Sequence, residues 1–377
     1  MKINKNIVLI SRVIVGLTFI FSGFVKAVDP IGSMIKIKDY LIAFNLPWME
    51  PFALFFAIIL CVYEFPLGIG ILSGVKSQLM SWLVFPLMIF FTFLTLYLAI
   101  ENPVSDCGCF GDAIKLTNWQ TFYKNLILIP FVVIIFLNRS TITPLFKKPG
   151  EWATVLFGTL VILLICFYGV LYEPFLDFRA YKKGNDIEAL MTLPEGVQGD
   201  VYETVLLFKD TKTGKIKEFD ENNIPMDDQW QWLETKSELV KKGAEPKTKD
   251  FKLTDSTGAD VTGQFLAQSG YKLLIVQHKL SHSNPKAQAK LNELFTKLQE
   301  DAFIKVYAAT SSLTSEITEF SKKNQVPYSF FNADIVLLET IIRSNPGVIL
   351  FKDNVVVQKW PFRKIPDFEK LSKIVFD

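Results

Sequence analysis

Histidine is almost absent from this chain, and cysteine is scarce. The 377 residues include two His, both in the second half, and four Cys, none of which follows position 166. This distribution leaves too little imidazole for a metal site in the first half and excludes thiol chemistry from the second. The net charge is +2, so the chain lacks the strong basic field that attracts nucleic acid. The sequence therefore predicts neither a metal centre nor a nucleic-acid partner.

Charged residues are scarce in only one half of the chain. Residues 1–172 are apolar and aromatic, whereas residues 173–377 hold most of the Lys, Asp and Glu. Half of all residues are hydrophobic, which is more than a soluble protein of this length needs. Two solvents are implied, with lipid around the first half and water around the second.

Five long apolar runs account for the excess of hydrophobic residues. Each is about 20 residues long, enough for a helix to cross a ~30 Å hydrocarbon core. The first run is long for a cleaved signal peptide and has no clear small-residue cleavage site, so we expect it to remain as a span. The sequence predicts a bundle of five transmembrane helices at residues 7–25, 52–73, 79–100, 119–138 and 153–172.

Lys and Arg near the ends of these runs favour a cytoplasmic N-terminus. Five crossings then place the residues after 172, and the loop between the third and fourth runs, on the outer face. In a bacterial cell this arrangement corresponds to an inner-membrane protein with its C-terminal domain in the periplasm. A short segment at 34–44 predicts a further helix, which lies either at the membrane surface or packed over the mouth of the bundle.

The second half carries the pattern of a water-soluble α/β domain. Strand patterns at 271–277, 303–309, 328–331, 348–351 and 355–360 alternate with helix patterns. This alternation predicts a mixed sheet covered by helices. Before this domain, residues 176–245 predict a small α+β connecting region with a hairpin at 201–219 and a small core around Trp230 and Trp232. We divide the chain into four parts, at 1–140, 141–175, 176–245 and 246–377.

Cys107-Gly108-Cys109 is the clearest chemical motif in the sequence, and it lies on the loop between the third and fourth runs. Two thiols this close can close a strained disulfide ring or exchange disulfides with a partner. In an oxidising compartment the pair serves either as a redox pair or as a static disulfide that fixes the loop. The residues alone leave both interpretations open.

Glu64 is a carboxylate within the second run, at a depth where charge is costly and marks a functional candidate. We expect it to be neutral or to pair with Lys26, near the outer end of the first run. Glu64 and Lys26 form a candidate pocket for a quinone-type cofactor, and a structural hydrogen bond between helices is the alternative. Cys61 and Cys166 lie inside two of the runs, and we expect them to pack as small hydrophobic side chains.

The membrane half resembles the DoxX and MauE families of small helical membrane proteins, in their Bacteroidetes form. The resemblance covers about residues 5–140 and implies a four-helix bundle, to which this chain adds a fifth helix. These families are associated with membrane redox chemistry and with disulfide maturation of exported proteins. The resemblance rests on Ser11-Arg12, Val15-Gly16, residues 21–30, Glu64 with Gly68 and Gly70, residues 102–112 (NPVSDCGCFGD) and residues 116–119.

Residues 246–377 are similar to thioredoxin-like domains of the TlpA kind. Asn345-Pro346-Gly347 matches the position of the cis-proline turn of that fold. The redox Cys-x-x-Cys is absent, and Gln277-His278-Lys279-Leu280 stands near its place. The resemblance therefore implies the fold without oxidoreductase activity, and a surface that binds client proteins.

Two functions remain as hypotheses from the sequence. In the first, Cys107 and Cys109 carry out thiol–disulfide or quinone-linked redox chemistry in the maturation of periplasmic or exported proteins. In the second, the chain is a non-catalytic scaffold or accessory subunit of a larger secretion or envelope-assembly complex, and its disulfide is structural. A transporter is disfavoured because no repeat and no set of buried charges is evident.

Overall fold

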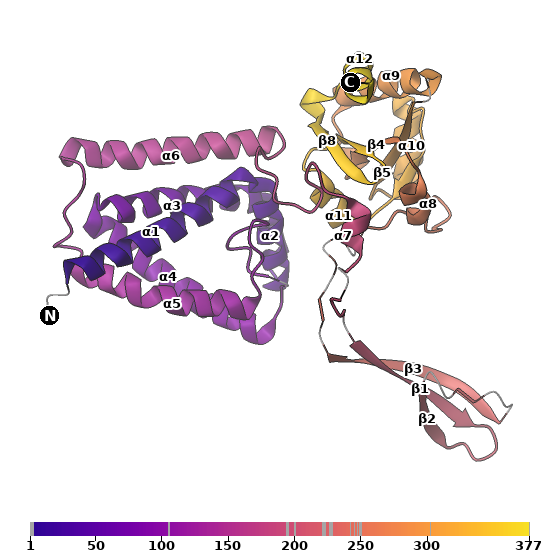
Figure 1. Ribbon diagram of the computed structural model, residues 1–377, viewed down its shortest axis with the longest axis horizontal. Helices are drawn as coiled ribbons and strands as arrows, with labels where there is room; N and C mark the ends of the chain where they lie inside the picture. The colour runs from indigo at the N-terminus through magenta and orange to yellow at the C-terminus, as the bar shows by residue number, and fades with distance from the viewer. Residues whose placement is uncertain are drawn as a thin grey trace.

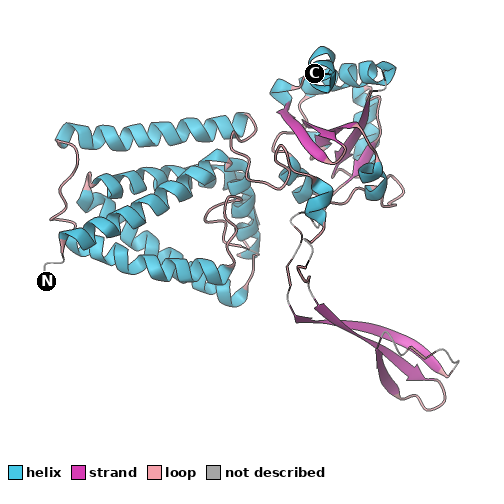
Figure 2. Ribbon diagram, viewed as in Figure 1, coloured by secondary structure: helices cyan, strands magenta, loops and turns pink. Residues whose placement is uncertain are grey.

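The computed structural model divides into a helical membrane bundle, a mixed α/β domain and a projecting sheet (Figure 1). It describes residues 4–104, 106–193, 196–199, 201–220, 224–225, 229–241, 243–244, 246, 248, 251–301 and 303–376. Figure 2 shows that every described strand lies in the second half of the chain.

Within these residues, five helices are long and apolar enough to cross a membrane, which confirms the five predicted spans. Four of them form a compact bundle, and the fifth packs beside it (Figure 1). They are α1 (Lys5–Val28), α3 (Ala53–Ser73, preceded by the 3-10 helix η1, Pro47–Phe52), α4 (Ser77–Glu101), α5 (Asn118–Asn138) and α6 (Lys148–Leu171).

Helices α1 and α3 pack closely because glycines face the partner backbone. A Cβ atom on Gly23 would lie 2.8 Å from the backbone nitrogen of Phe65, and one on Gly68 would lie 2.6 Å from that of Ile20. Only glycine permits this approach, which is a common way for membrane helices to associate. The close contact brings the end of α1 alongside the middle of α3.

Helix α2 (Pro30–Ala43) lies across one end of the bundle (Figure 1). Asp29 begins it, because its side chain accepts a hydrogen bond from the Gly32 N–H at 2.9 Å and Pro30 suits the first helical position. The predicted helix is therefore present, and it packs over the end of the bundle. We call this end of the bundle, with the α4–α5 loop and the end of α6, the loop face.

The C-terminal domain has a five-stranded sheet in the order β6-β5-β4-β7-β8. Strand β4 is parallel to β5 and antiparallel to β7, so the sheet is mixed as predicted. Alternate residues of β4 face two separate cores, with Leu273 and Ile275 on one side and Leu274 and Val276 on the other. The strands are β4 (Tyr271–Gln277), β5 (Ile304–Thr310), β6 (Phe330–Asn332), β7 (Gly347–Lys352) and β8 (Val355–Pro361).

Helices cover both faces of this sheet, and the Asn345–Pro346 peptide bond just before β7 is cis. A β-α-β unit followed by a cis-proline, an antiparallel hairpin and a final helix is the thioredoxin-like arrangement, as expected from the sequence. The described helices of this domain are α8 (Thr262–Ala267), α9 (Pro285–Asp301), α10 (Thr314–Asn324), α11 (Ile335–Ile341) and α12 (Phe368–Phe376), with the 3-10 turns η2 (Leu280–His282) and η3 (Phe362–Lys364).

The connecting region contains α7 (Ile187–Met191) and an antiparallel sheet of β1 (Val201–Asp210), β2 (Ile216–Asp220) and β3 (Trp230–Lys241). The predicted hairpin is confirmed; of the predicted core, half-buried Trp230 joins a small aromatic cluster with Phe219 and Phe208, whereas the prediction for Trp232 is wrong. The sheet extends away from both domains (Figure 1), and Trp232 is 57% exposed. Trp230 contacts the ring of Phe219 at 5.1 Å between centroids, within the sheet itself.

Candidate functional site

The Cys-Gly-Cys motif lies on the loop face, where α4 and α5 are joined. Asn102 ends α4 in a left-handed conformation, and Thr117 begins α5 with a capping box. Between them Gly108 has a φ of +66°, which favours glycine and turns the chain sharply. This turn brings the Cys107 and Cys109 sulfur atoms to 3.1 Å from each other.

Hydrogen bonds from α1 and α2 fix the backbone of this loop. The Tyr40 hydroxyl donates to the Cys107 carbonyl at 2.9 Å. The Cys109 carbonyl accepts from the Ser22 hydroxyl at 2.8 Å and from Lys26 Nζ at 2.7 Å. The two half-buried cysteines therefore lie on a loop whose backbone is hydrogen-bonded to α1 and α2.

Lys26 and Glu64 form a buried ion pair directly beneath the motif. Their charged atoms lie 2.8 Å apart, and the residues are 6% and 4% exposed. The predicted pairing is therefore correct. The Lys26 ammonium also donates to Ser22 Oγ at 2.6 Å, so Glu64, Ser22 and the Cys109 carbonyl satisfy its three N–H groups.

A quinone pocket at Lys26 and Glu64 stays a prediction. Neither residue lines the two cavities described below. Since the ammonium already has three acceptors, a quinone oxygen would have to replace one of them. Among the described residues, no cluster of three or more His, Cys, Asp or Glu could hold a metal ion.

The two thiols of the motif differ in acidity. The hydrogen bond between the two sulfur atoms, together with Lys124 and Lys26, lowers the pKa of Cys109, although burial opposes them. The same hydrogen bond, together with burial, raises the pKa of Cys107. Cys109 is therefore the more acidic of the two thiols, and its thiolate is the nucleophilic form.

A network of charges joins the membrane bundle to the thioredoxin-like domain. Arg343, two residues before the cis peptide bond, contacts Asp29 at 2.7 Å and Asp112 of the α4–α5 loop at 3.5 Å. The Glu173 carboxylate accepts the backbone N–H groups of Arg343 and Ser344 at 3.0 and 3.1 Å. We call the network the ionic junction, and its members are Asp29, Asp112, Glu173, Asp177, Arg179, Arg343 and Lys359.

Arg179 and Lys359 complete the ionic junction from either side of Asp177. Arg179 contacts Glu173 at 2.8 Å and Asp177 at 2.7 Å, and Lys359 contacts Asp177 at 2.9 Å. Burial acts to raise the pKa of Asp29, but Arg343 and Arg179 outweigh it and lower that pKa. Burial and Arg179 together lower the pKa of Lys359 to about 8, although Asp177 opposes them.

A cavity of about 740 Å³ lies between the Cys-Gly-Cys loop and the thioredoxin-like domain. Gly108 and Asp112 line it from the loop, Lys36 from α2, and Leu337 and Arg343 from the soluble domain. Of the three motif residues, Gly108 lines this cavity, whereas the two cysteines are not among its lining residues.

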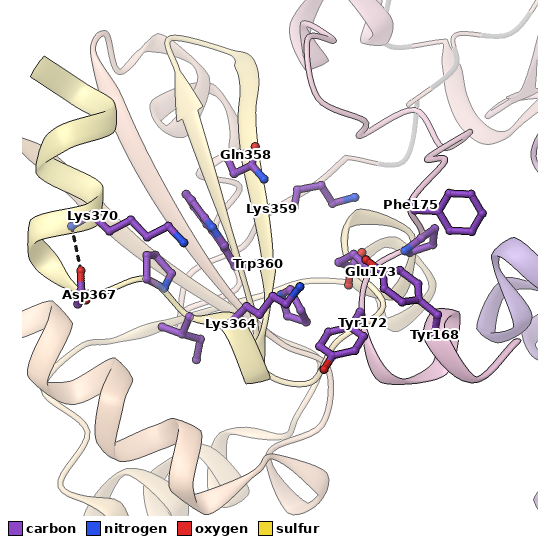
Figure 3. Close-up of a pocket in the computed structure, with 14 residues that line it drawn as sticks. Tyr168, Tyr172, Glu173, Phe175, Gln358, Lys359, Trp360, Lys364, Asp367 and Lys370 are labelled. Atoms are coloured by element: carbon purple, nitrogen blue, oxygen red, sulfur yellow. Dashed lines mark hydrogen bonds between the residues drawn. The ribbon is translucent and has the colours of Figure 1, made fainter. Parts of the chain in front are cut away.

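A second cavity of about 510 Å³ lies where α6 ends (Figure 3). Tyr168 and Tyr172 line it from α6, and Trp360 and Lys364 line it from the β8 side. None of its described lining residues is a cysteine. This cavity is therefore separate from the thiol site.

The place of the missing redox motif is filled by a buried histidine. His278 Nε2 lies 2.8 Å from the Ile342 carbonyl, and burial lowers the His278 pKa to about 4. The ring is therefore neutral near pH 7 and fixes the segment before the cis peptide bond. This segment is directed toward the ionic junction, not toward open solvent.

Sequence reasoning found Cys107, Cys109, Lys26 and Glu64, and the structure brings all four together. It missed the ionic junction. One signal was available for Asp29, which lies before Pro30 as a helix-capping residue does. No pattern in the sequence points to Arg343, because its partner Asp29 lies on another domain, whereas Arg179 pairs with Glu173 and Asp177 of its own segment.

Two family models match parts of the chain. Residues 4–138 match the model described as methylamine utilisation protein MauE. Residues 202–242, which span the projecting sheet, match a domain of unknown function, DUF8463. No curated protein matches the chain. The MauE part of the predicted resemblance is confirmed, and the DoxX part stays a prediction.

Several solved structures resemble the C-terminal domain at low sequence identity. A secreted disulfide oxidoreductase of Mycobacterium tuberculosis is 16% identical, with 34% of this chain and 95% of that chain covered and a TM-score of 0.27. The thioredoxin domain of a Bacteroides vulgatus thiol-disulfide oxidoreductase is 14% identical, with 33% and 92% covered and a TM-score of 0.27. A thiol:disulfide interchange protein from Bacteroides sp. is 12% identical, with 33% and 86% covered and a TM-score of 0.27.

The family match and the strand order together describe the chain as two joined parts. The four-helix bundle coincides with the residues that match MauE. The mixed sheet and the cis-proline define the second part. The chain therefore carries a MauE membrane domain at its N-terminus, followed by a fifth apolar helix and a thioredoxin-like domain that has no cysteine.

Proposed function

We propose that this protein exchanges thiols and disulfides with cysteine-containing exported proteins at the outer face of a bacterial inner membrane. The observation that carries the proposal is the setting of the two thiols: their sulfur atoms lie 3.1 Å apart on a loop held by Tyr40 and Lys26, and Lys124 and Lys26 favour the thiolate of Cys109. A static disulfide needs no such preference for a thiolate, whereas exchange requires a thiolate at neutral pH.

The electrons and bonds of the exchange balance between this protein and its partner. The Cys109 thiolate attacks a partner disulfide, forms a mixed disulfide and releases one partner thiolate. Cys107 then loses its proton and attacks Cys109, which closes the Cys107–Cys109 disulfide and releases the partner as a dithiol. The reverse sequence oxidises a partner dithiol. The same two electrons pass in either direction, and the net direction depends on the partner's reduction potential.

The thioredoxin-like domain has a positioning role in this proposal. Its segment before the cis-proline binds Glu173 and Asp29 of the same chain. We therefore place the partner in the 740 Å³ cavity, which Gly108 lines. Binding of clients by the domain alone, as the sequence suggested, stays a prediction.

A trapping experiment tests this function in native membranes. Cys107→Ser removes the resolving thiol, so Cys109 should retain partners as mixed disulfides that are seen on non-reducing gels and released by reductant. The matched variant Cys109→Ser leaves only the less acidic thiol and should trap far less. If neither variant forms an adduct and exported proteins keep their oxidation state, the exchange function is wrong.

A non-catalytic scaffold is the second candidate, and the projecting sheet favours it. Ile216, Trp232 and Val240 are 61%, 57% and 61% exposed on this sheet, and exposed apolar side chains of this size often mark protein contacts. In that case a large complex should co-purify with the chain after both loop cysteines are replaced. The contact should be lost in Trp232→Asp with Val240→Asp.

A further inference from the structure

The two remaining cysteines of the chain meet inside the membrane bundle. Cys61 lies on α3 and Cys166 on α6, and their side chains interact with each other inside the bundle. Both are buried in one cluster with Ala27 and Ile162, at 0% and 1% exposure. All four cysteines of the chain therefore occur as two contacting pairs.

The packing of α6 holds this second pair together. Gly158, Ile162, Cys166 and Gly169 are its buried apolar positions, three or four residues apart and hence on one face. A Cβ atom on Gly158 would lie 2.7 Å from Ile69 Cδ1, and one on Gly169 would lie 2.6 Å from Pro30 Cδ. The two glycines fix α6 close to the bundle on either side of Cys166.

Plain packing explains why small residues occupy these positions, but it does not explain why both are cysteine. Alanine or serine would also fit a tight helix contact, and glycine and alanine already do so at Gly158, Gly169 and Ala27. Two cysteines that are far apart in the sequence share one small buried cluster. The specific property of that arrangement is that it can form and break a disulfide.

The surroundings of the pair select the kind of oxidant that can reach it. Ile58, Val62 and Ile165 are partly buried apolar side chains that pack against the cluster. They lie on membrane-spanning helices, so the reagent must approach through an apolar layer from the lipid. A water-soluble disulfide such as glutathione is excluded from that layer by its charge.

We propose that Cys61 and Cys166 form a second redox-active pair, which exchanges electrons with a lipid-soluble quinone. In the oxidising direction both thiols lose their hydrogens and the S–S bond forms between α3 and α6. The quinone takes up two electrons and two protons and becomes a quinol. The proposal does not depend on exchange at Cys107 and Cys109.

The chain offers a direct test, because only Cys166 follows the turn between α5 and α6. A protease site is inserted in that turn, and the full-length protein is reduced and placed in liposomes. Decylubiquinone is added, free thiols are blocked in denaturant, and the chain is cleaved. A Cys61–Cys166 disulfide keeps the two fragments together on a non-reducing gel.

We expect nearly complete linkage of the fragments and the formation of one quinol per link. Oxidised glutathione should give almost none in the same time. Cys61→Ser should abolish the link with the loop cysteines intact, whereas Cys107→Ser with Cys109→Ser should leave it unchanged. Two results would overturn the proposal: both thiols remaining free with quinone present, or glutathione acting as fast as the quinone. Neither result bears on trapping at Cys109, so the two proposals fail separately.

Discussion

The thioredoxin-like fold and the cysteines of this protein lie in different domains, whereas a thioredoxin-type oxidoreductase has both in one domain. The soluble domain has the mixed sheet and the cis-proline, but it has no cysteine. The membrane domain and α6 have all four cysteines, arranged as two contacting pairs. Where the usual redox motif would lie, a neutral His278 stabilises the loop that docks onto the bundle.

The two domains also differ in where their buried ion pairs lie. The bundle buries a single ion pair, Lys26 with Glu64, among the described residues of its spans, and it places that pair beneath the thiols. The soluble domain uses its charges at its boundary, where Arg343 and Lys359 complete the ionic junction. The buried ion pair of the spans therefore lies beside the thiols, whereas Arg343 and Lys359 of the soluble domain contribute to docking.

The largest effect should come from removing one partner of the buried pair. Lys26→Met leaves the Glu64 carboxylate buried without a counter-ion, so we expect a loss of about 3–5 kcal/mol in the free energy of unfolding. This free energy is measured by denaturant unfolding in detergent, with the helix content as the signal. Lys115→Met is the matched control, because Lys115 is exposed. Equal stability of the two variants would show that the buried charges are not coupled.

The second largest effect should come from Arg343, on which we expect the docking of the soluble domain to depend. Arg343→Met removes the hydrogen bonds to the Asp29 carboxylate, and a bond to a charged group contributes about 1.5–3 kcal/mol. We expect faster hydrogen exchange in residues 172–179 with little change inside the bundle. Arg363→Met is the control, since exposed Arg363 has one hydrogen bond, to the Leu171 carbonyl. A similar change in both variants would contradict a specific role for Arg343.

The same docking should weaken in acid. The pKa of Asp29 is lowered in the folded protein, so its contribution is present above the ordinary Asp pKa of about 4 and is lost as the pH falls through the lower folded value. Hydrogen exchange in the linker should therefore rise below about pH 4 in the native chain. Asp29→Asn should remove most of this pH dependence. An unchanged acid response in that variant would assign it to other carboxylates.

The difference between the two loop thiols should be visible in their alkylation. The pKa of Cys109 is lowered and that of Cys107 is raised, so Cys109 should reach its half-maximal rate with iodoacetamide at a lower pH than Cys107. Mass spectrometry of the reduced protein distinguishes the two sites. Lys124→Met should move the Cys109 midpoint upward, because it removes a nearby cation. Equal rates at both cysteines would remove the observation that carries the exchange mechanism.

The smallest effect should come from the projecting sheet. Trp232→Ala removes an exposed side chain, so we expect a change within about 0.5 kcal/mol in unfolding free energy. Trp360→Ala, in the core of the thioredoxin-like domain, should cost about 3–5 kcal/mol. A large loss from Trp232→Ala would mean that the sheet packs against another part of the protein.

The elements were predictable because the relevant signals are local. Hydropathy over about 20 residues reports a span directly, and alternating strand and helix patterns report the sheet. The pairing of Lys26 with Glu64 was also predictable, because a charge at that depth must find a partner.

Contacts between distant elements were not predictable. The Cys61–Cys166 contact depends on the rotation of α6 about its axis, and the ionic junction depends on where the soluble domain docks. The exposure of Trp232 was not predictable either, because a strand-forming aromatic residue has the same sequence pattern whether or not another layer covers it. Propensity reports the strand, while burial depends on the rest of the fold.

The contact between Asp29 and Arg343 also has a consequence for how the protein is made. The two residues are 314 positions apart in the chain. During translation Asp29 emerges first, at the end of α1, and it lacks this partner until 314 further residues have been synthesised and the thioredoxin-like domain has reached the same side of the membrane. The contact therefore closes long after α1 has been made, and the cavity that Gly108 and Arg343 line is completed only then.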